Sequence, residues 1–207
     1  MHGTFMIGEF WTNIQEYEYR KWCAVCHEVE TMEHILTDCP TESVRLIWDL
    51  ARETWPHSQD DWPQVDFGTI LGCGSLAITP PENRDWQNQA ERNRPNLSGP
   101  NRLLHILISE SAYLIWVLRC ERSIQLKTHS VQEIRNRWLR AINERLTNDK
   151  IIATRIKRNG AMMMSVDSTW KAALSREWEL PPNWMTDSEV LVGRRARNVR
   201  SRDEHVH

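Results

Sequence analysis

Residues 23–40 read Cys-Ala-Val-Cys-His-Glu-Val-Glu-Thr-Met-Glu-His-Ile-Leu-Thr-Asp-Cys-Pro. Within this run the potential metal ligands follow the pattern Cys23-x2-Cys26-x7-His34-x4-Cys39. Two cysteines separated by two residues can turn both thiolates toward one point, and a His and a Cys from a following helical turn can complete a tetrahedron. Three thiolates and one imidazole suit Zn²⁺. We therefore expect a structural zinc site, closed by four protein ligands and hence without an open catalytic position.

Other interpretations of the same run stay open. Cys23-Ala-Val-Cys26-His27 also has the C-x-x-C-H pattern of covalent haem attachment, with Met32 as a poor distal ligand. A redox-active C-x-x-C pair is a third interpretation, although no thioredoxin-like βαβ pattern surrounds it. His27 could replace His34 as a ligand only with an awkward local turn, so we expect it at the surface. Cys73 and Cys120 stand alone and are expected to be small buried hydrophobic residues.

Composition and length describe an ordinary folded protein. The chain has 207 residues, of which 40% are hydrophobic and 26% charged, and its formal net charge is −2. We find no run of 18 or more apolar residues and no secretory signal pattern near the start, so we expect an intracellular protein, in the cytoplasm or nucleus, with no membrane span. In that setting five cysteines are better explained as thiols or metal ligands than as disulfides.

Periodicity and capping signals predict a mainly α fold, a small zinc knuckle followed by a helical bundle. Thr31 is expected to cap a short helical turn that carries His34. Apolar residues at helical spacing, together with start and stop signals, predict longer helices. These helices are expected at about residues 41–55, 100–125, 131–158 and 168–178. The second is apolar on most sides and should lie centrally, and the third should begin with a capping box made by Ser130 and Glu133.

These signals also divide the chain. We expect a zinc-binding module with its following helix at residues 1–56, a long loop or linker at 57–99, a helical domain at 100–192 and a flexible Arg-rich tail at 193–207. Tryptophan is unusually frequent, with 11 residues, and four of these side chains are expected in the core rather than on a stacking surface. The four are Trp22, Trp48, Trp116 and Trp138.

Charge is distributed unevenly along the chain. Residues 1–118 carry 8 Lys/Arg against 17 Asp/Glu, whereas residues 119–207 carry 18 against 11. A basic half is compatible with RNA or DNA as a partner, although charge alone favours ordinary solvated helix faces. The candidate phosphate contacts are Arg135, Arg137, Arg140, Arg155, Lys157 and Arg158.

Residues 23–40 resemble the reverse-transcriptase zinc-binding domain of LINE-like, non-LTR retroelements. The shared features are the C-x-x-C, the acidic stretch with Glu30 and Glu33, the His-Ile-Leu at position 34 and the Cys-Pro at position 39. Residues 8–22, 103–122, 180–184 and 190–193 are similar to C-terminal tails of fungal retroelement polyproteins. The resemblance implies the same four zinc ligands and a role in holding template RNA or target DNA beside a polymerase part of a polyprotein.

Searches for catalytic motifs find none, so we expect no enzymatic activity from the chain itself. Asp60-Asp61 lacks the aromatic-x-Asp-Asp context of a polymerase and is expected to lie in a cap or turn. His105, on an apolar helix, is expected to be a hydrogen-bonded core histidine. Two alternatives to a nucleic-acid-binding module remain. One is a zinc-stapled helical protein-interaction module, and the other is a relic fragment without separate function.

Overall fold

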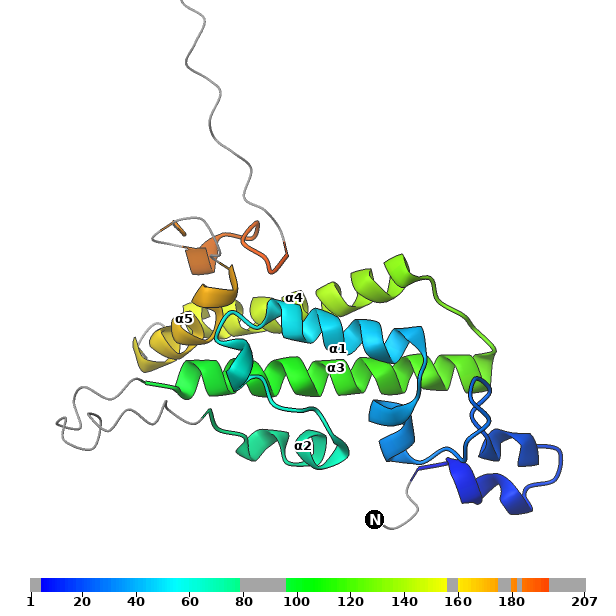
Figure 1. The fold of residues 1–207 in the computed structure, drawn as a ribbon. Coiled ribbons are helices and arrows are strands. Elements are labelled where there is room, and N and C mark those ends of the chain that lie inside the picture. The colour runs from blue at the N-terminus through cyan, green and yellow to red at the C-terminus, as the bar shows by residue number, and fades with distance from the viewer. Residues whose placement is uncertain (1–4, 79–95, 156–159, 175–179, 182–183, 194–207) are drawn as a thin grey trace, which may run out of the picture.

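The computed structural model describes residues 5–78, 96–155, 160–174, 180–181 and 184–193, which form a helical bundle with a small loop-rich unit at one end (Figure 1). Within these ranges there is no β-strand, and Trp22 and Val29 form an isolated antiparallel bridge. The mainly α fold, with a Cys/His knuckle preceding a bundle, is confirmed. The longer helices are α1 (Glu42–Thr54), α2 (Phe67–Leu71), α3 (Ser98–Gln125), α4 (Val131–Arg155) and α5 (Gly160–Leu174). The short ones are η1 (Gly8–Asn13), η2 (Glu18–Lys21), η3 (His34–Asp38), η4 (Gln59–Asp61), η5 (Cys73–Ser75) and η8 (Trp184–Thr186).

Helix α3 is the centre of the bundle, as its apolar character on most sides predicts. It packs against α1, α4 and α5, and Figure 1 shows it running the length of the molecule. By length and composition alone α3 could also cross a membrane, with a mean hydropathy of 1.4 over its most apolar window. In this fold 61% of that window is buried. A helix at the core of a bundle is apolar on most sides because most of its sides are buried.

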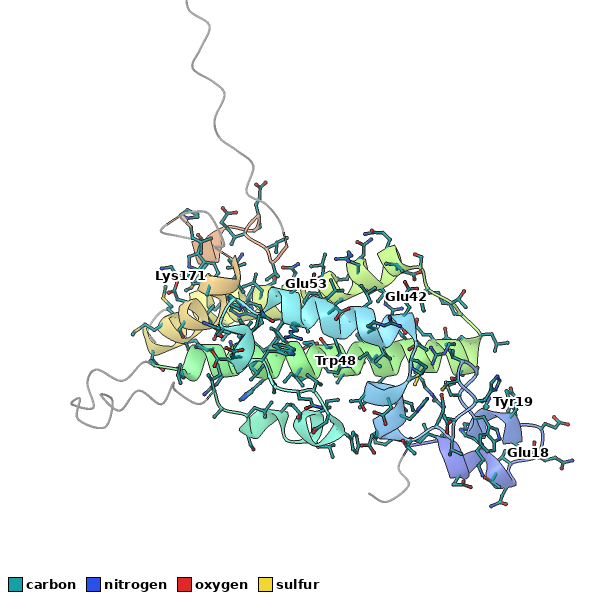
Figure 2. All side chains as sticks on the ribbon, viewed as in Figure 1. Glu18, Tyr19, Glu42, Trp48, Glu53 and Lys171 are labelled. Atoms are coloured by element: carbon teal, nitrogen blue, oxygen red, sulfur yellow. The ribbon has the colours of Figure 1, made fainter. Side chains whose placement is uncertain are left out.

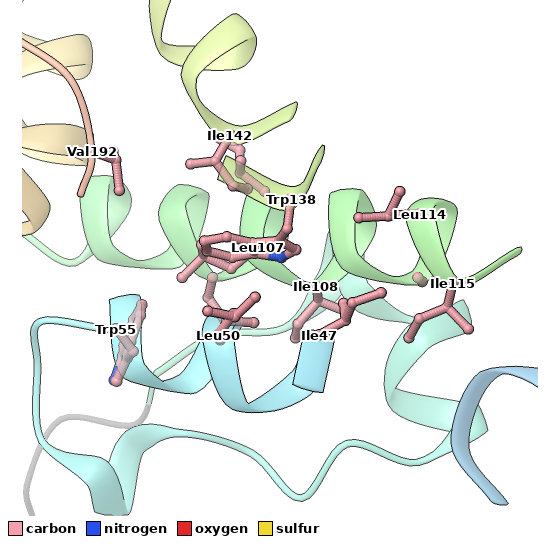
Figure 3. Packing of buried hydrophobic residues seen from close by; sticks show 14 of the residues in the cluster. Ile47, Leu50, Trp55, Leu107, Ile108, Leu114, Ile115, Trp138, Ile142 and Val192 are labelled. Atoms are coloured by element: carbon pink, nitrogen blue, oxygen red, sulfur yellow. The ribbon is translucent and has the colours of Figure 1, made fainter. Parts of the chain in front are cut away.

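The main core lies where α1 and α4 pack on α3. Ile47 of α1 and Trp138 and Ile142 of α4 meet Leu107 and Ile108 of α3 (Figure 3), and all five are at most 1% exposed. Full burial of each such side chain stabilises the fold by about 1.5–3 kcal/mol. The indole N–H of Trp138 donates to Ser111 Oγ at 2.9 Å, so the polar atom of this buried ring is satisfied.

Three of the predicted helices have nearly the predicted bounds. Helix α1 ends at Thr54, just before Trp55-Pro56, and α3 ends at Gln125. At the start of α4 the backbone N–H of Glu133 donates to Ser130 Oγ at 3.2 Å, which confirms half of the capping box. The Glu133 carboxylate instead contacts His129 Nδ1 at 2.7 Å. The predicted end of this helix, at residue 158, lies outside the described residues.

The predicted last helix is wrong at its start. Helix α5 begins at Gly160, eight residues before the expected Ser168. In the sequence, Gly160 is typical of a residue that ends the preceding helix. The structure instead makes it the first residue of α5, because Val166 and Trp170, one turn apart, are buried against the bundle. The expected continuation over residues 175–178 lies outside the described residues.

Much of the segment expected to be a long loop is packed against the core. Residues 57–78 contain η4, α2 and η5, and Trp62, Phe67 and Ile70 pack against the main cluster. Asp66 caps α2 by accepting the N–H of Thr69 at 2.6 Å. A helix of five residues carries too little periodicity to be found in the sequence. The rest of the predicted loop over residues 79–95, and the tail from residue 194, lie outside the described residues.

The four tryptophans expected in the core differ in burial. Trp138 is fully buried, whereas Trp48 and Trp116 are partly buried. Trp22 is 48% exposed, so the expectation is wrong for this residue. It directly precedes Cys23 of the knuckle, and Lys21 Nζ lies 5.3 Å from its ring centre.

Candidate metal centre

The first two cysteines lie on a tight turn closed by backbone hydrogen bonds. The N–H of His27 donates to Cys23 O at 2.9 Å, and the N–H of Cys23 donates to Glu28 O at 2.8 Å. His27 adopts a left-handed conformation, with φ of 61°, which reverses the chain directly after Cys26. The turn thereby holds the Cys23 and Cys26 sulfurs on the same side.

The other two ligand candidates come from the next helical turn. Thr31 Oγ1 accepts the N–H of His34 at 2.9 Å, which confirms the predicted cap. From His34 the chain follows a π-helical turn, in which the N–H of Cys39 donates to His34 O at 2.8 Å. Because a π turn pairs residues five apart, it places His34 and Cys39 on one face, which a regular α-helix would not do.

These two turns bring all four ligand atoms together. Cys26 Sγ lies 3.2 Å from His34 Nε2, Cys23 Sγ lies 3.7 Å from Cys39 Sγ, and the four atoms lie within 4.8 Å of one another. The sulfur separation is well beyond the length of a disulfide, about 2.05 Å, and all five cysteines are free thiols. Cys23, His34 and Cys39 are buried and Cys26 is partly exposed. The cluster can hold one metal ion.

Two of the thiols have opposite pKa shifts. Burial opposes ionisation of Cys23, but hydrogen bonds from the Cys26 and Val25 backbone and from His34 outweigh it and lower the pKa to about 6. For Cys39, burial dominates and raises the pKa to about 11, with the Cys23 charge adding to the effect. Two adjacent thiolates are therefore unfavourable without a cation. A divalent ion would make both thiolates favourable, because a thiol that coordinates a metal ion is deprotonated outright.

The knuckle is fastened to the bundle by contacts that the sequence interpretation missed. Glu30 and Arg119 form a buried ion pair, in which Arg119 Nε donates to Glu30 Oε2 at 2.8 Å. The indole N–H of Trp48 donates to Leu36 O at 2.9 Å. A charge that directly follows an uncharged, mostly apolar stretch, such as Arg119 after residues 111–118 of α3, is the sequence signal that could have indicated a buried partner.

The other histidines, cysteines and aspartates that the sequence analysis singled out lie outside the metal cluster. His27 is exposed, as expected, and Cys73 and Cys120 are partly buried rather than fully buried. The Nε2–H of His105 donates to Leu76 O at 2.7 Å, so this partly buried histidine is hydrogen-bonded as expected. Asp60 and Asp61 lie in η4, where Ser58 Oγ accepts the N–H of Asp60 at 3.2 Å.

The candidate phosphate contacts do not form one compact patch. Arg135 and Arg155 lie near opposite ends of α4, about 30 Å apart at 1.5 Å per residue. Arg140 and Arg155 are exposed and Arg135 is partly buried. Arg137 forms a bidentate ion pair with Glu121, with Nη1–Oε2 and Nη2–Oε1 distances of 2.6 and 2.9 Å. Lys157 and Arg158 lie outside the described residues.

Comparisons with protein-family models, with curated proteins and with solved structures found no match to this chain.

Proposed function

We propose that this chain is a zinc-binding module that binds nucleic acid and has no catalytic activity of its own. The observation that carries the zinc part is the mutual approach of four ligand atoms. In a tetrahedral site with Zn–S bonds of about 2.3 Å, two sulfurs lie about 3.8 Å apart, and Cys23 and Cys39 are separated by 3.7 Å. The three thiolates and the imidazole would hold the ion, and its role would be to stabilise the fold.

The metal assignment is tested by mass spectrometry of the purified full chain under native conditions. We expect about one zinc per chain, absent from a Cys26→Ser/His34→Ala variant. The matched controls are His27→Ala and Cys73→Ser, which change the same residue types outside the cluster and should keep the zinc. A metal-free wild-type chain would overturn the assignment, and so would a His27→Ala variant that loses the ion.

The nucleic-acid part rests on charge and on the retroelement resemblance. The basic residues of the chain are concentrated after residue 118, and Arg140 and Arg155 extend from the exposed side of α4. Exposed arginines attract phosphate without base selectivity. A structural zinc site with four protein ligands leaves no open metal position for substrate, which is why we propose binding rather than catalysis.

Salt-dependent binding is the test of this part. Affinity for RNA and DNA oligonucleotides is measured by fluorescence anisotropy. The logarithm of the association constant should fall linearly with the logarithm of the salt concentration between about 50 and 200 mM. An Arg140→Glu/Arg155→Glu variant should bind more weakly and with a shallower salt slope. Arg45→Glu, which changes an exposed arginine on α1, is the matched control and should have the smaller effect. Affinity that is independent of salt would contradict the proposal.

One observation favours a second candidate, a zinc-stapled protein-interaction module. Large exposed hydrophobic side chains cluster in the first part of the described chain, around the knuckle. They are Phe5, Met6, Phe10, Tyr17, Tyr19, Trp22 and Val25. Clusters of this kind mark interaction sites. A concentration-dependent dimer in sedimentation, together with no binding to RNA or DNA, would favour this candidate over the first.

A further inference from the structure

A cavity of about 310 Å³ lies next to the knuckle. Its lining residues come from the end of the bundle where α1 begins, α3 ends and α4 begins, and Figure 1 shows these helix ends. Figure 2 labels Glu42 at this end of α1. The volume is at the lower limit of small-molecule sites, about 300–1,000 Å³. The walls come from three parts of the chain, and we call this space the knuckle-side cavity. Its lining residues are Val25, Pro40, Thr41, Glu42, Ser43, Leu118, Arg122, Lys127, Thr128, His129 and Ile134.

Arg122 gives this cavity an unpaired cation. Its Nε atom is buried and has no hydrogen-bond partner in the described part of the chain. The neighbouring basic groups are already engaged, since Lys127 lies 3.7 Å from Glu133 and His129 lies between Glu133 and Glu121. The side chain as a whole is partly buried, and a guanidinium without an acidic partner leaves its donors available to an anionic ligand. The guanidinium fork matches phosphate oxygens better than any other common ligand group.

The start of α1 adds further donors on the opposite wall. The Thr41 side chain makes no capping hydrogen bond to this 13-residue helix. The N–H groups of the first turn, including those of Glu42 and Ser43, therefore lack the side-chain acceptor that usually satisfies them. Free N–H groups at a helix N-terminus favour an anion. One acidic group opposes this preference, because Glu42 also lines the cavity.

From Arg122 and the uncapped start of α1 together, we propose that the knuckle-side cavity binds a phosphate group. The bound phosphate group could belong either to a nucleic-acid backbone or to a small phosphate compound. Assignment to the nucleic-acid backbone rests on the proposed function. The cavity itself does not, since its donors come from α1 and α3 rather than from the proposed contacts on α4.

The test is a titration of the full zinc-loaded chain with inorganic phosphate at constant ionic strength, followed by NMR of backbone amides. Resonances of Ser43, Arg122 and Thr128 should shift and saturate. Arg122→Gln should weaken binding by at least about tenfold, whereas Glu42→Gln should strengthen it. Arg52→Gln, an exposed arginine in the last turn of α1, should leave phosphate binding unchanged. Lys127→Gln should have a smaller effect than Arg122→Gln, because Lys127 already lies 3.7 Å from Glu133.

Each outcome of the titration has one meaning. Shifts that do not saturate, or that are equal in the wild type and in Arg122→Gln, would overturn the proposal. A thymidine oligonucleotide that displaces phosphate would assign the site to the nucleic-acid backbone. Saturable phosphate binding without such competition would assign it to a small phosphate compound. If the full chain fails to bind nucleic acid but still binds phosphate, the proposed function fails and the cavity assignment stands.

Discussion

Glu30 and Arg119 are separated by 89 residues in the chain and form a buried ion pair between the knuckle and α3. Their side chains are 2% and 5% exposed, and the Arg119 guanidinium also lies 5.6 Å from the centre of the Trp116 ring. A buried charge is tolerated only with a partner. This pair, together with the hydrogen bond from Trp48 to Leu36 O, therefore fixes the knuckle on the bundle.

Removing one partner of this pair should destabilise the protein strongly. We expect Arg119→Met to lower the free energy of unfolding by about 3–5 kcal/mol, because Glu30 would remain buried and unpaired. Urea unfolding measures the change. An Arg119→Met/Glu30→Gln double variant should recover part of the loss. Glu9→Gln, which removes the exposed pair with Lys21, is the control and should have little effect.

The contact between α3 and α5 depends on a glycine. A Cβ atom added to Gly99 would overlap the backbone carbonyl of Ser168. We expect Gly99→Ala to push the two helices apart and to lower the melting temperature, whereas alanine at an uncrowded helix position would raise it. Gly74→Ala is the control, because no atom lies within 4 Å of the position of its Cβ. An unchanged melting temperature for Gly99→Ala would contradict this close approach.

Acid should weaken the connection between α3 and α4. The hydrogen bonds from Arg137, opposed by burial, lower the pKa of Glu121 from 4.5 to about 2, with Arg137 and His129 charges contributing. A carboxyl whose folded pKa is below its unfolded value stabilises the fold fully above about 4.5 and loses that contribution as the pH falls toward 2. Glu121→Gln should flatten the pH dependence of urea unfolding in this range. The exposed Glu144→Gln control should retain it.

The end of α3 offers a stabilising substitution. Leu126 adopts a left-handed conformation, with φ of 54°, and is 82% exposed. Glycine has no steric penalty in this conformation, so we expect Leu126→Gly to raise the free energy of unfolding by about 1 kcal/mol. Gln125→Gly, at the last helical residue, should lower it instead. Equal effects of the two substitutions would refute the role assigned to the C-terminal cap.

Metal removal should loosen the knuckle before the core. The indole N–H of Trp48 bonds to Leu36 in η3, whereas that of Trp138 bonds to Ser111 inside the bundle. On addition of a chelator we expect hydrogen exchange of the Trp48 indole to accelerate and that of Trp138 to stay slow. If the indole N–H groups of Trp48 and Trp138 lost their protection from exchange together, the metal-binding turn and the bundle would unfold as one unit.

Local patterns identified the helices that have strong signals at both ends. Helix α1 has Pro40-Thr41 before it and Trp55-Pro56 after it, and α4 has its Ser130 cap. Helix α2 was missed because five residues provide barely one turn of periodicity, and α5 was misplaced because Gly160 can end one helix or begin another. Neither ambiguity can be resolved without knowing which side chains become buried.

The candidate metal ligands could be predicted because both turns that assemble them are local. The spacing in residues 23–39 already restricts Cys23, Cys26, His34 and Cys39 to a small volume. Tertiary structure alone decided the partner of Glu30, the exposure of Trp22, the commitment of Arg137 to Glu121 and the cavity that contains Arg122. Each of these features depends on where two helices that are far apart in the sequence cross. The crossing is set by the packing of one helix face against another, and not by the residues that are neighbours in the sequence.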